Sequence, residues 1–229
     1  MPLIISTWGQ PANYICLARA IEEARLAFFR TLGKPDEQVW LPTAVPNTPG
    51  GPRWPQQPAW HRIRAGSQTI ISSSGLTDPF EEADQPNLGY GVEVALATND
   101  EIPEQLHPSW LLDLAVAVSN QAAIDGRFNL RAAKFGVFLF GAPKAPASYG
   151  PWLDRTGTLG FLVGVPIPDF SGTMKLPLDD AMFLMAKLLT PAEYEFIASY
   201  GPAGAQLVVE RFAKDQTYHL SSLHRKSVV

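Results

Sequence analysis

Three apolar segments constrain the fold of this chain most strongly, because a strand that is apolar on both faces must be covered by other elements on both sides. Residues 135–140, 159–165 and 181–189 are rich in Phe, Leu, Val and Met, and their single charged residue is Lys187. A strand that is apolar on both faces lies inside a sheet whose two faces are covered. The first two segments therefore predict central strands of a sheet against which helices pack, and the third predicts a further strand.

Two other segments predict strands from their β-rich composition or their alternation. Residues 69–73 are short and β-rich. In residues 92–96, Val92, Val94 and Leu96 fall on one face, and Glu93 falls on the other. We expect Val92, Val94 and Leu96 to point into the core.

Helices are predicted on either side of these strands. Residues 13–32 and 108–126 place apolar residues on one face at helical spacing. A third helix begins with a capping box at Thr190 and Glu193, and a break is expected at Gly201. Together these elements predict an α+β fold: a mixed β-sheet packed against helices, with an N-terminal helix and a proline-rich arm.

The arm lies between the first helix and the strands. Its prolines recur at every third residue, the period of polyproline II: Pro46, Pro49, Pro52, Pro55 and Pro58. Such a stripe either lies on its own domain, anchored by Trp54 and Trp60, or binds an aromatic groove of another protein. We favour the first, because the stripe connects two structured segments. The predicted division is residues 1–59 (helix and arm), 60–215 (main domain) and 216–229 (a loose polar tail).

Composition excludes several classes of protein. With 18 Lys and Arg against 22 Asp and Glu, and a net charge of −4, the chain lacks the cationic surplus of a nucleic-acid-binding protein. No apolar run reaches the roughly 18 residues of a membrane span, and no signal peptide is recognised. The single cysteine, Cys16, excludes an internal disulfide and a cysteine-rich zinc site. We expect a cytoplasmic protein without a cofactor or a metal.

No catalytic motif emerges from the residues. A phosphate-binding glycine loop, a dinucleotide fingerprint and a nucleophile elbow are all absent from the sequence. The four histidines lack the helical spacing of a zinc site. We therefore expect a protein that is not an enzyme. The alternative is a small hydrolase whose site forms near the turn from Ser72 to Asp78 and His107, with a nucleophile and a base in hydrogen-bond contact.

One segment has an uneven charge distribution. Residues 65–126 contain no Lys or Arg but ten acidic residues. An acidic surface repels nucleic acid and attracts a basic partner, unless folding mixes the charges again. The predicted partner-binding residues are Asp78, Glu81, Glu82, Asp84, Glu93, Asp100, Glu101 and Glu104.

Five segments follow one another in an order found in a known family. They are SGLTDP (residues 74–79), GVEVAL (91–96), WLLDLA (110–115), FLVGVP (161–166) and LTPAEYE (189–195). In this order the chain resembles the suppressor of fused domain family over residues 60–213. It departs from the family at Leu76 and Thr77, where Met-Ser is usual, and at the helix entry formed by Leu189, Thr190 and Pro191.

The resemblance implies a non-enzymatic protein-binding domain. Animal members sequester a transcription factor by gripping a short peptide that adds as a strand. Bacterial members resemble immunity proteins that neutralise toxins of polymorphic-toxin systems, and the length of this chain is closer to theirs. We therefore expect the chain to mask or neutralise a basic, toxin-like partner protein, with no nucleic acid and no membrane involved. A homodimer formed through the first helix is a further hypothesis.

Overall fold

The computed structural model describes residues 11–42, 51–143 and 147–229. Its helices are α1 (Pro11–Leu32), α2 (Trp110–Asp125), α3 (Phe128–Phe135), the 3₁₀ helix η1 (Ala147–Trp152) and α4 (Pro191–Lys214). Its strands are β1 (Lys34–Trp40), β2 (Ala59–Ala65), β3 (Gln68–Ser74), β4 (Val92–Thr98), β5 (Phe138–Ala142), β6 (Leu159–Val163), β7 (Thr173–Lys175) and β8 (Asp180–Leu188).

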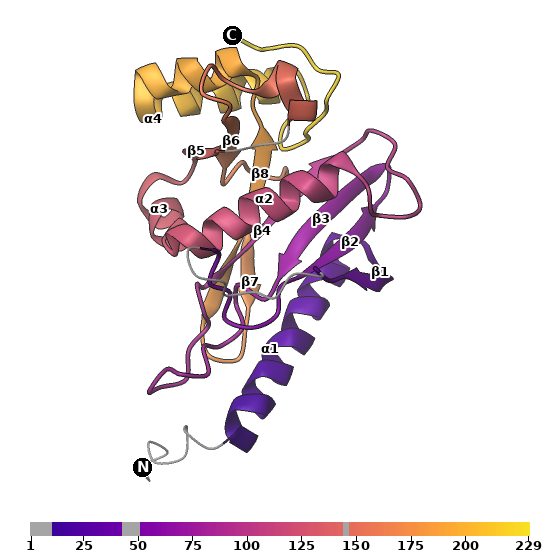
Figure 1. Ribbon diagram of the computed structural model, residues 1–229, viewed down its shortest axis with the longest axis vertical. Helices are drawn as coiled ribbons and strands as arrows, with labels where there is room; N and C mark the ends of the chain where they lie inside the picture. The colour runs from indigo at the N-terminus through magenta and orange to yellow at the C-terminus, as the bar shows by residue number, and fades with distance from the viewer. Residues whose placement is uncertain (1–10, 43–50, 144–146) are drawn as a thin grey trace.

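In this part of the chain, eight strands form one mixed sheet (Figure 1). The order is β1-β2-β3-β4-β8-β6-β5, and β7 pairs with β8 beside this path. The β4–β8 pair is parallel, whereas β1–β2, β2–β3, β3–β4, β5–β6, β6–β8 and β7–β8 are antiparallel. The predicted α+β class and mixed sheet are confirmed.

Helices cover both faces of the sheet. Val92, Val94 and Leu96 of β4 pack on the α2 side, as the alternation predicts. Ala95 and Ala97 pack on the opposite side with the apolar face of α1. The second face of β4 is therefore also buried. The apolar face of α1 is therefore occupied by contacts within the chain. The homodimer through this helix stays a prediction.

The apolar segments form β5, β6 and β8, but β5 is not a central strand. It lies at the end of the described sheet, beyond β6. Its two faces are apolar because Phe138 and Phe140 pack beside Phe128 of α3, whereas Leu139 packs on the α4 side. An edge strand needs two apolar faces when helices cover both of them.

Five elements were not predicted from the sequence: β1, β2, β7, α3 and the short helix η1. β1 lies where the proline-rich arm was expected. The strand was not predicted because Pro35, Asp36 and Glu37 are poor strand formers. The strand forms because it pairs with β2 and because Asp36 binds Arg62 and Arg64 of that strand. Residues 34–40 thus belong to the same sheet as the main domain, although they lie within the predicted unit 1–59.

The described end of the proline-rich arm packs on its own domain. Pro46 and Pro49 lie outside the described residues. Trp54 and Trp60 are buried, and their indole N–H groups donate to Asn120 Oδ1 (2.9 Å) and Ser119 Oγ (3.0 Å) of α2. The two tryptophans are therefore the anchors that the first interpretation requires.

The prediction of a loose tail is wrong. Ser221 is buried, its N–H donates to the Ala97 carbonyl, and its hydroxyl accepts from the Leu188 N–H. Lys187 of β8, also buried, donates to the tail carbonyls of Leu220 (2.5 Å) and Thr217 (3.2 Å). The tail is polar because it satisfies buried polar groups of the sheet.

The capping box at the start of α4 is confirmed, and it also holds the tail. The Thr190 hydroxyl accepts from the Glu193 N–H, and the Glu193 carboxylate accepts from the Thr190 N–H. The same carboxylate binds Arg225 and the Val228 N–H. Further along α4, the helix is interrupted at Gly201 (φ 60°, ψ −141°), as predicted.

No helix within the described residues is both long enough and apolar enough to cross a membrane.

Removing the cap should destabilise the protein. We expect Thr190→Ala to lower the free energy of unfolding by about 1 kcal/mol, because the Glu193 N–H loses its acceptor. Ser199→Ala, an exposed change in the same helix, should stay within about 0.5 kcal/mol of the parent. Urea denaturation measures both, and equal losses would contradict the role of the cap.

Candidate partner-binding site

The predicted partner-binding residues do not form one acidic surface. One group, at residues 78–84, lies in the loop between β3 and β4, and the other, at residues 100–104, follows β4. The seven residues of β4 separate the groups by roughly 20 Å. Arg53 pairs with Glu82, and Arg64 pairs with Glu104 (3.0 Å). Folding therefore mixes part of the charge and leaves two smaller acidic groups.

The prediction that Glu93 faces a partner is wrong, because its side chain is fully buried. The Glu93 carboxylate accepts from the backbone N–H groups of Gly75 and Thr77, each at 3.0 Å. It also accepts from the hydroxyls of Ser73 (2.5 Å) and Thr77 (2.7 Å). Glu93 therefore fixes the turn that follows β3.

Arg25 of α1 extends this buried cluster. Its Nη1 lies 2.7 Å from Asp78 Oδ1 and 3.4 Å from Glu93 Oε1. Burial lowers the pKa of Arg25, but the carboxylates of Asp78 and Glu93 outweigh that effect, so the pKa is raised. Asp78 is therefore a structural ion-pair partner at the edge of the acidic loop.

β1 is an edge of the sheet among the described strands. Its backbone groups that point away from β2 are therefore not paired within that sheet. Alternate residues point to opposite faces: Asp36, Gln38 and Trp40 to the α2 side, and Val39 to the α1 side. Each of these two sides carries a pocket.

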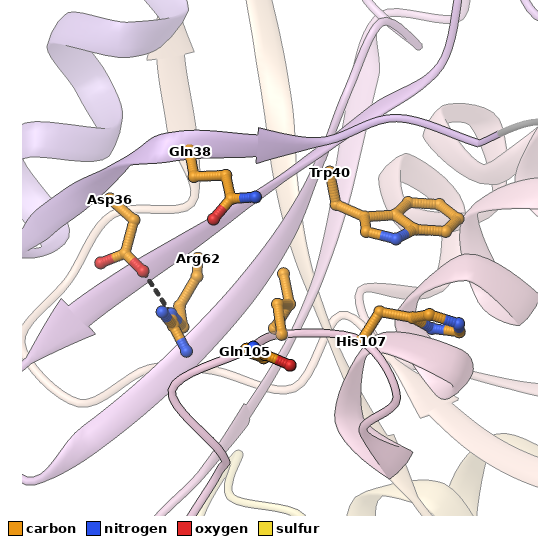
Figure 2. A pocket seen from close by; sticks show the side chains of 7 residues that line it. Asp36, Gln38, Trp40, Arg62, Gln105 and His107 are labelled. Carbon is orange, nitrogen blue, oxygen red and sulfur yellow. Dashed lines mark hydrogen bonds and ion pairs between the residues drawn. The ribbon is translucent and has the colours of Figure 1, made fainter.

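The pocket on the α2 side, which we call the loop-side pocket, has a volume of about 340 Å³ (Figure 2). The following residues line it: Asp36, Gln38, Trp40, Arg62, Gln105, Leu106 and His107. Arg62 positions the 103–107 loop, because it donates to the carbonyls of Pro103 (2.9 Å) and Glu104 (2.8 Å) while it binds Asp36. Burial raises the pKa of Asp36, but hydrogen bonds from Arg64 and Arg62 outweigh this effect. The pKa of Asp36 is therefore lowered.

Aromatic side chains form one wall of the loop-side pocket. The ring of Trp40 lies 5.1 Å from that of Trp60 and 6.1 Å from that of His107, between centroids. Trp40 is half-buried, and His107 is exposed. Because the charges of Arg62 and Asp36 compensate each other, this wall favours a side chain with a ring or an aliphatic surface.

The second pocket, which we call the helix-side pocket, has a volume of about 540 Å³ and lies between α1 and the sheet. Tyr14, Glu22 and Arg25 of α1 line it, together with His61 of β2 and Asp78. Burial raises the pKa of Tyr14, and the nearby carboxylates of Glu81, Asp78 and Glu82 raise it further. One acidic group of the sequence therefore lies around this pocket.

His61 is a neutral, buried side chain of the helix-side pocket. Its ring packs 5.6 Å from that of Phe29, and its Nδ1 has no hydrogen-bond partner within the described residues. Burial and, to a smaller extent, the charge of Arg25 lower the pKa of His61 to about 4. The imidazole therefore adds no charge to the pocket at neutral pH.

The residues of the alternative hydrolase site are occupied by structural contacts. The hydroxyl of Ser72 donates to the Ser73 carbonyl, and those of Ser73 and Thr77 donate to Glu93. His107 lies in the loop-side pocket, and no hydrogen bond in the described part of the chain joins it to residues 72–78. Nor do three potential metal-ligating side chains gather anywhere in the described ranges.

Comparisons with known proteins do not assign the chain to a family. No protein-family model matches it, and no curated protein matches it significantly. The resemblance to the suppressor of fused domain family stays a prediction based on the order of its motifs.

Neutralising the Glu93 carboxylate should strongly destabilise the fold. We expect Glu93→Gln to lower the free energy of unfolding by about 3 kcal/mol, because it leaves Arg25 buried with less compensation. Glu101→Gln, at an exposed position, should change it by less than about 0.5 kcal/mol. Urea denaturation at pH 7 tests this, and a small loss for Glu93→Gln would show that the cluster is dispensable.

Burial of neutral His61 makes stability depend on pH. Its folded pKa of about 4 lies below the unfolded value of 6.5, so its contribution is complete above pH 6.5 and is lost as the pH falls toward 4. Between pH 7 and pH 5, the parent should lose about 2 kcal/mol more than His61→Gln. His107→Gln, an exposed control, should behave as the parent, and identical pH profiles for all three would contradict this assignment.

Proposed function

We propose that this chain is a non-enzymatic protein-binding domain that masks or neutralises a partner protein by holding an extended segment of it beside β1. The observation that supports this most directly is an edge strand with a pocket on each of its two faces. An added strand gains affinity from main-chain hydrogen bonds and selectivity from pockets for its alternate side chains.

The acidic groups favour a basic segment. Residues 78–82 lie near the helix-side pocket, since their carboxylates act on Tyr14. Glu104 belongs to the loop that bounds the loop-side pocket, and its side chain is 85% exposed. Because Glu104 is already paired with Arg64, the negative charge that should speed encounter with a positively charged partner lies chiefly near the helix-side pocket.

The edge itself discourages pairing between identical chains. If two copies of β1 paired antiparallel about their centres, Glu37 would lie opposite Glu37 of the other copy. Like charges directly opposite each other destabilise a strand pair, and Pro35 removes a further backbone donor. A hetero-partner with a basic residue near Glu37 avoids this cost.

Masking of a toxin-like partner is the biological role that the family resemblance adds to this proposal. We place that role in the cytoplasm, where an exposed free thiol such as that of Cys16 stays reduced.

A displayed library of random twelve-residue peptides, selected on the full chain, tests the proposed function. We expect basic, strand-forming peptides whose affinity falls at least fivefold with Glu37→Lys, because that change reverses the charge beside the edge. Glu210→Lys, the same change at an exposed position of α4, should leave the affinity unaltered. Selection of no peptide, or of peptides that do not distinguish the two variants, would refute binding at β1.

A further inference from the structure

We propose that the partner segment places a lysine or arginine in the helix-side pocket and an aromatic or aliphatic side chain in the loop-side pocket, at an odd separation in its sequence. This inference rests on the proposed function, because it assumes strand addition at β1. It goes further by assigning a different side-chain chemistry to each pocket.

The odd separation follows from the geometry of the edge. β1 sends Gln38 and Trp40 to the loop-side pocket and Val39 to the helix-side pocket. A strand that pairs with β1 continues the same sheet, and its own residues alternate between the same two faces. Residues separated by one or three positions therefore enter different pockets, whereas residues separated by two enter the same one.

Carboxylates outnumber guanidinium groups around the helix-side pocket by one, when the buried Glu93 behind its lining is counted with the lining residues. One guanidinium, that of Arg25, is shared by two carboxylates, Asp78 and Glu93. Arg19 and Glu22 of α1, both exposed, also line the pocket, and the Glu22 carboxylate contributes to the raised pKa of Arg25. The neutral His61 is 8% exposed and contributes no positive charge, so a cation from the partner would restore the balance.

The same pocket also has acceptors and an apolar wall for a long basic side chain. Asp78 binds Arg25 through Oδ1, and its Oδ2 makes no hydrogen bond within the described residues. Ile15, Val39 and Leu41 line another part of the pocket. Lysine and arginine bury their methylene stems on apolar surface while the charged head reaches polar groups.

The loop-side pocket differs in its chemistry. Its charged residues, Arg62 and Asp36, already bind each other, as the dashed line in Figure 2 shows. The exposed part of Trp40 and the imidazole of His107 offer ring surfaces instead. Rings pack favourably on other rings, so this pocket favours an apolar or aromatic side chain.

Two synthetic peptides of identical composition test the inference. Both are twelve-residue strands of Thr and Val with one Lys and one Trp, separated by three positions in the first peptide and by two in the second. We expect the first to bind the full chain at least tenfold more tightly by fluorescence anisotropy, because only its two side chains reach different pockets. Equal affinities would overturn the inference.

A second measurement assigns the lysine to the helix-side pocket. Replacing the peptide lysine by norleucine should weaken binding at least fivefold, and Glu22→Gln should reduce that difference. Glu23→Gln is the matched control, because Glu23 is an exposed neighbour on α1 that does not line the pocket. An unchanged difference in Glu22→Gln, or an equal reduction in both variants, would contradict the assignment.

Failure of this inference can be distinguished from failure of the proposed function. If neither designed peptide binds but library peptides bind in a way that needs Glu37, the pocket assignment is wrong and strand addition at β1 remains supported. If the library yields no peptide that depends on Glu37, the proposed function itself is refuted.

Discussion

The buried carboxylate of Glu93 is the interaction on which the arrangement of this protein depends most. It lies on β4, accepts three hydrogen bonds from the turn after β3 and one from Ser73 near the end of β3, and contacts Arg25 of α1. A charged group leaves water only when paired and hydrogen-bonded, so the cluster forms as a unit. Because α1 forms one wall of the helix-side pocket, the same cluster that docks the helix also shapes the candidate site.

A second glutamate organises the other end of the molecule in the same way. Glu193 caps α4 and holds Arg225, so the beginning of the last helix and the end of the chain share one carboxylate. Lys187 and Ser221 connect the same tail to β8. In both places, a buried glutamate joins segments that are far apart in the sequence.

The candidate site forms because β1 is an edge strand of the described sheet. β1 is held to β2 by the Asp36–Arg62 and Asp36–Arg64 ion pairs, and Arg62 also fixes the loop that closes one pocket. Proline, negative charge and a register irregularity between Pro35 and Val39 limit indiscriminate pairing at this edge. A selective edge of this kind suits recognition of one complementary segment better than general self-association.

The local elements of this protein follow from short-range patterns in its sequence. Apolar segments predicted β5, β6 and β8, and alternation predicted which side of β4 faces α2. The capping box and Gly201 predicted where α4 begins and where it is interrupted. These signals are readable because they depend on neighbours within a few residues. Trp40, an aromatic residue in a polar, proline-rich stretch, is a sequence signal for the site that was not used in the prediction.

The remaining features depend on contacts between segments that are far apart in the sequence. Arg25 and Glu93 are 68 positions apart, and Arg62 and Pro103 are 41 apart, so no local pattern reveals their contacts. The charge segregation in residues 65–126 suggested one acidic surface, but the two ends of β4 separate the acids, and arginines from other segments neutralise several of them. Whether a carboxylate is exposed or buried depends on which distant segment covers it, and that is settled by packing rather than by its neighbours in the chain.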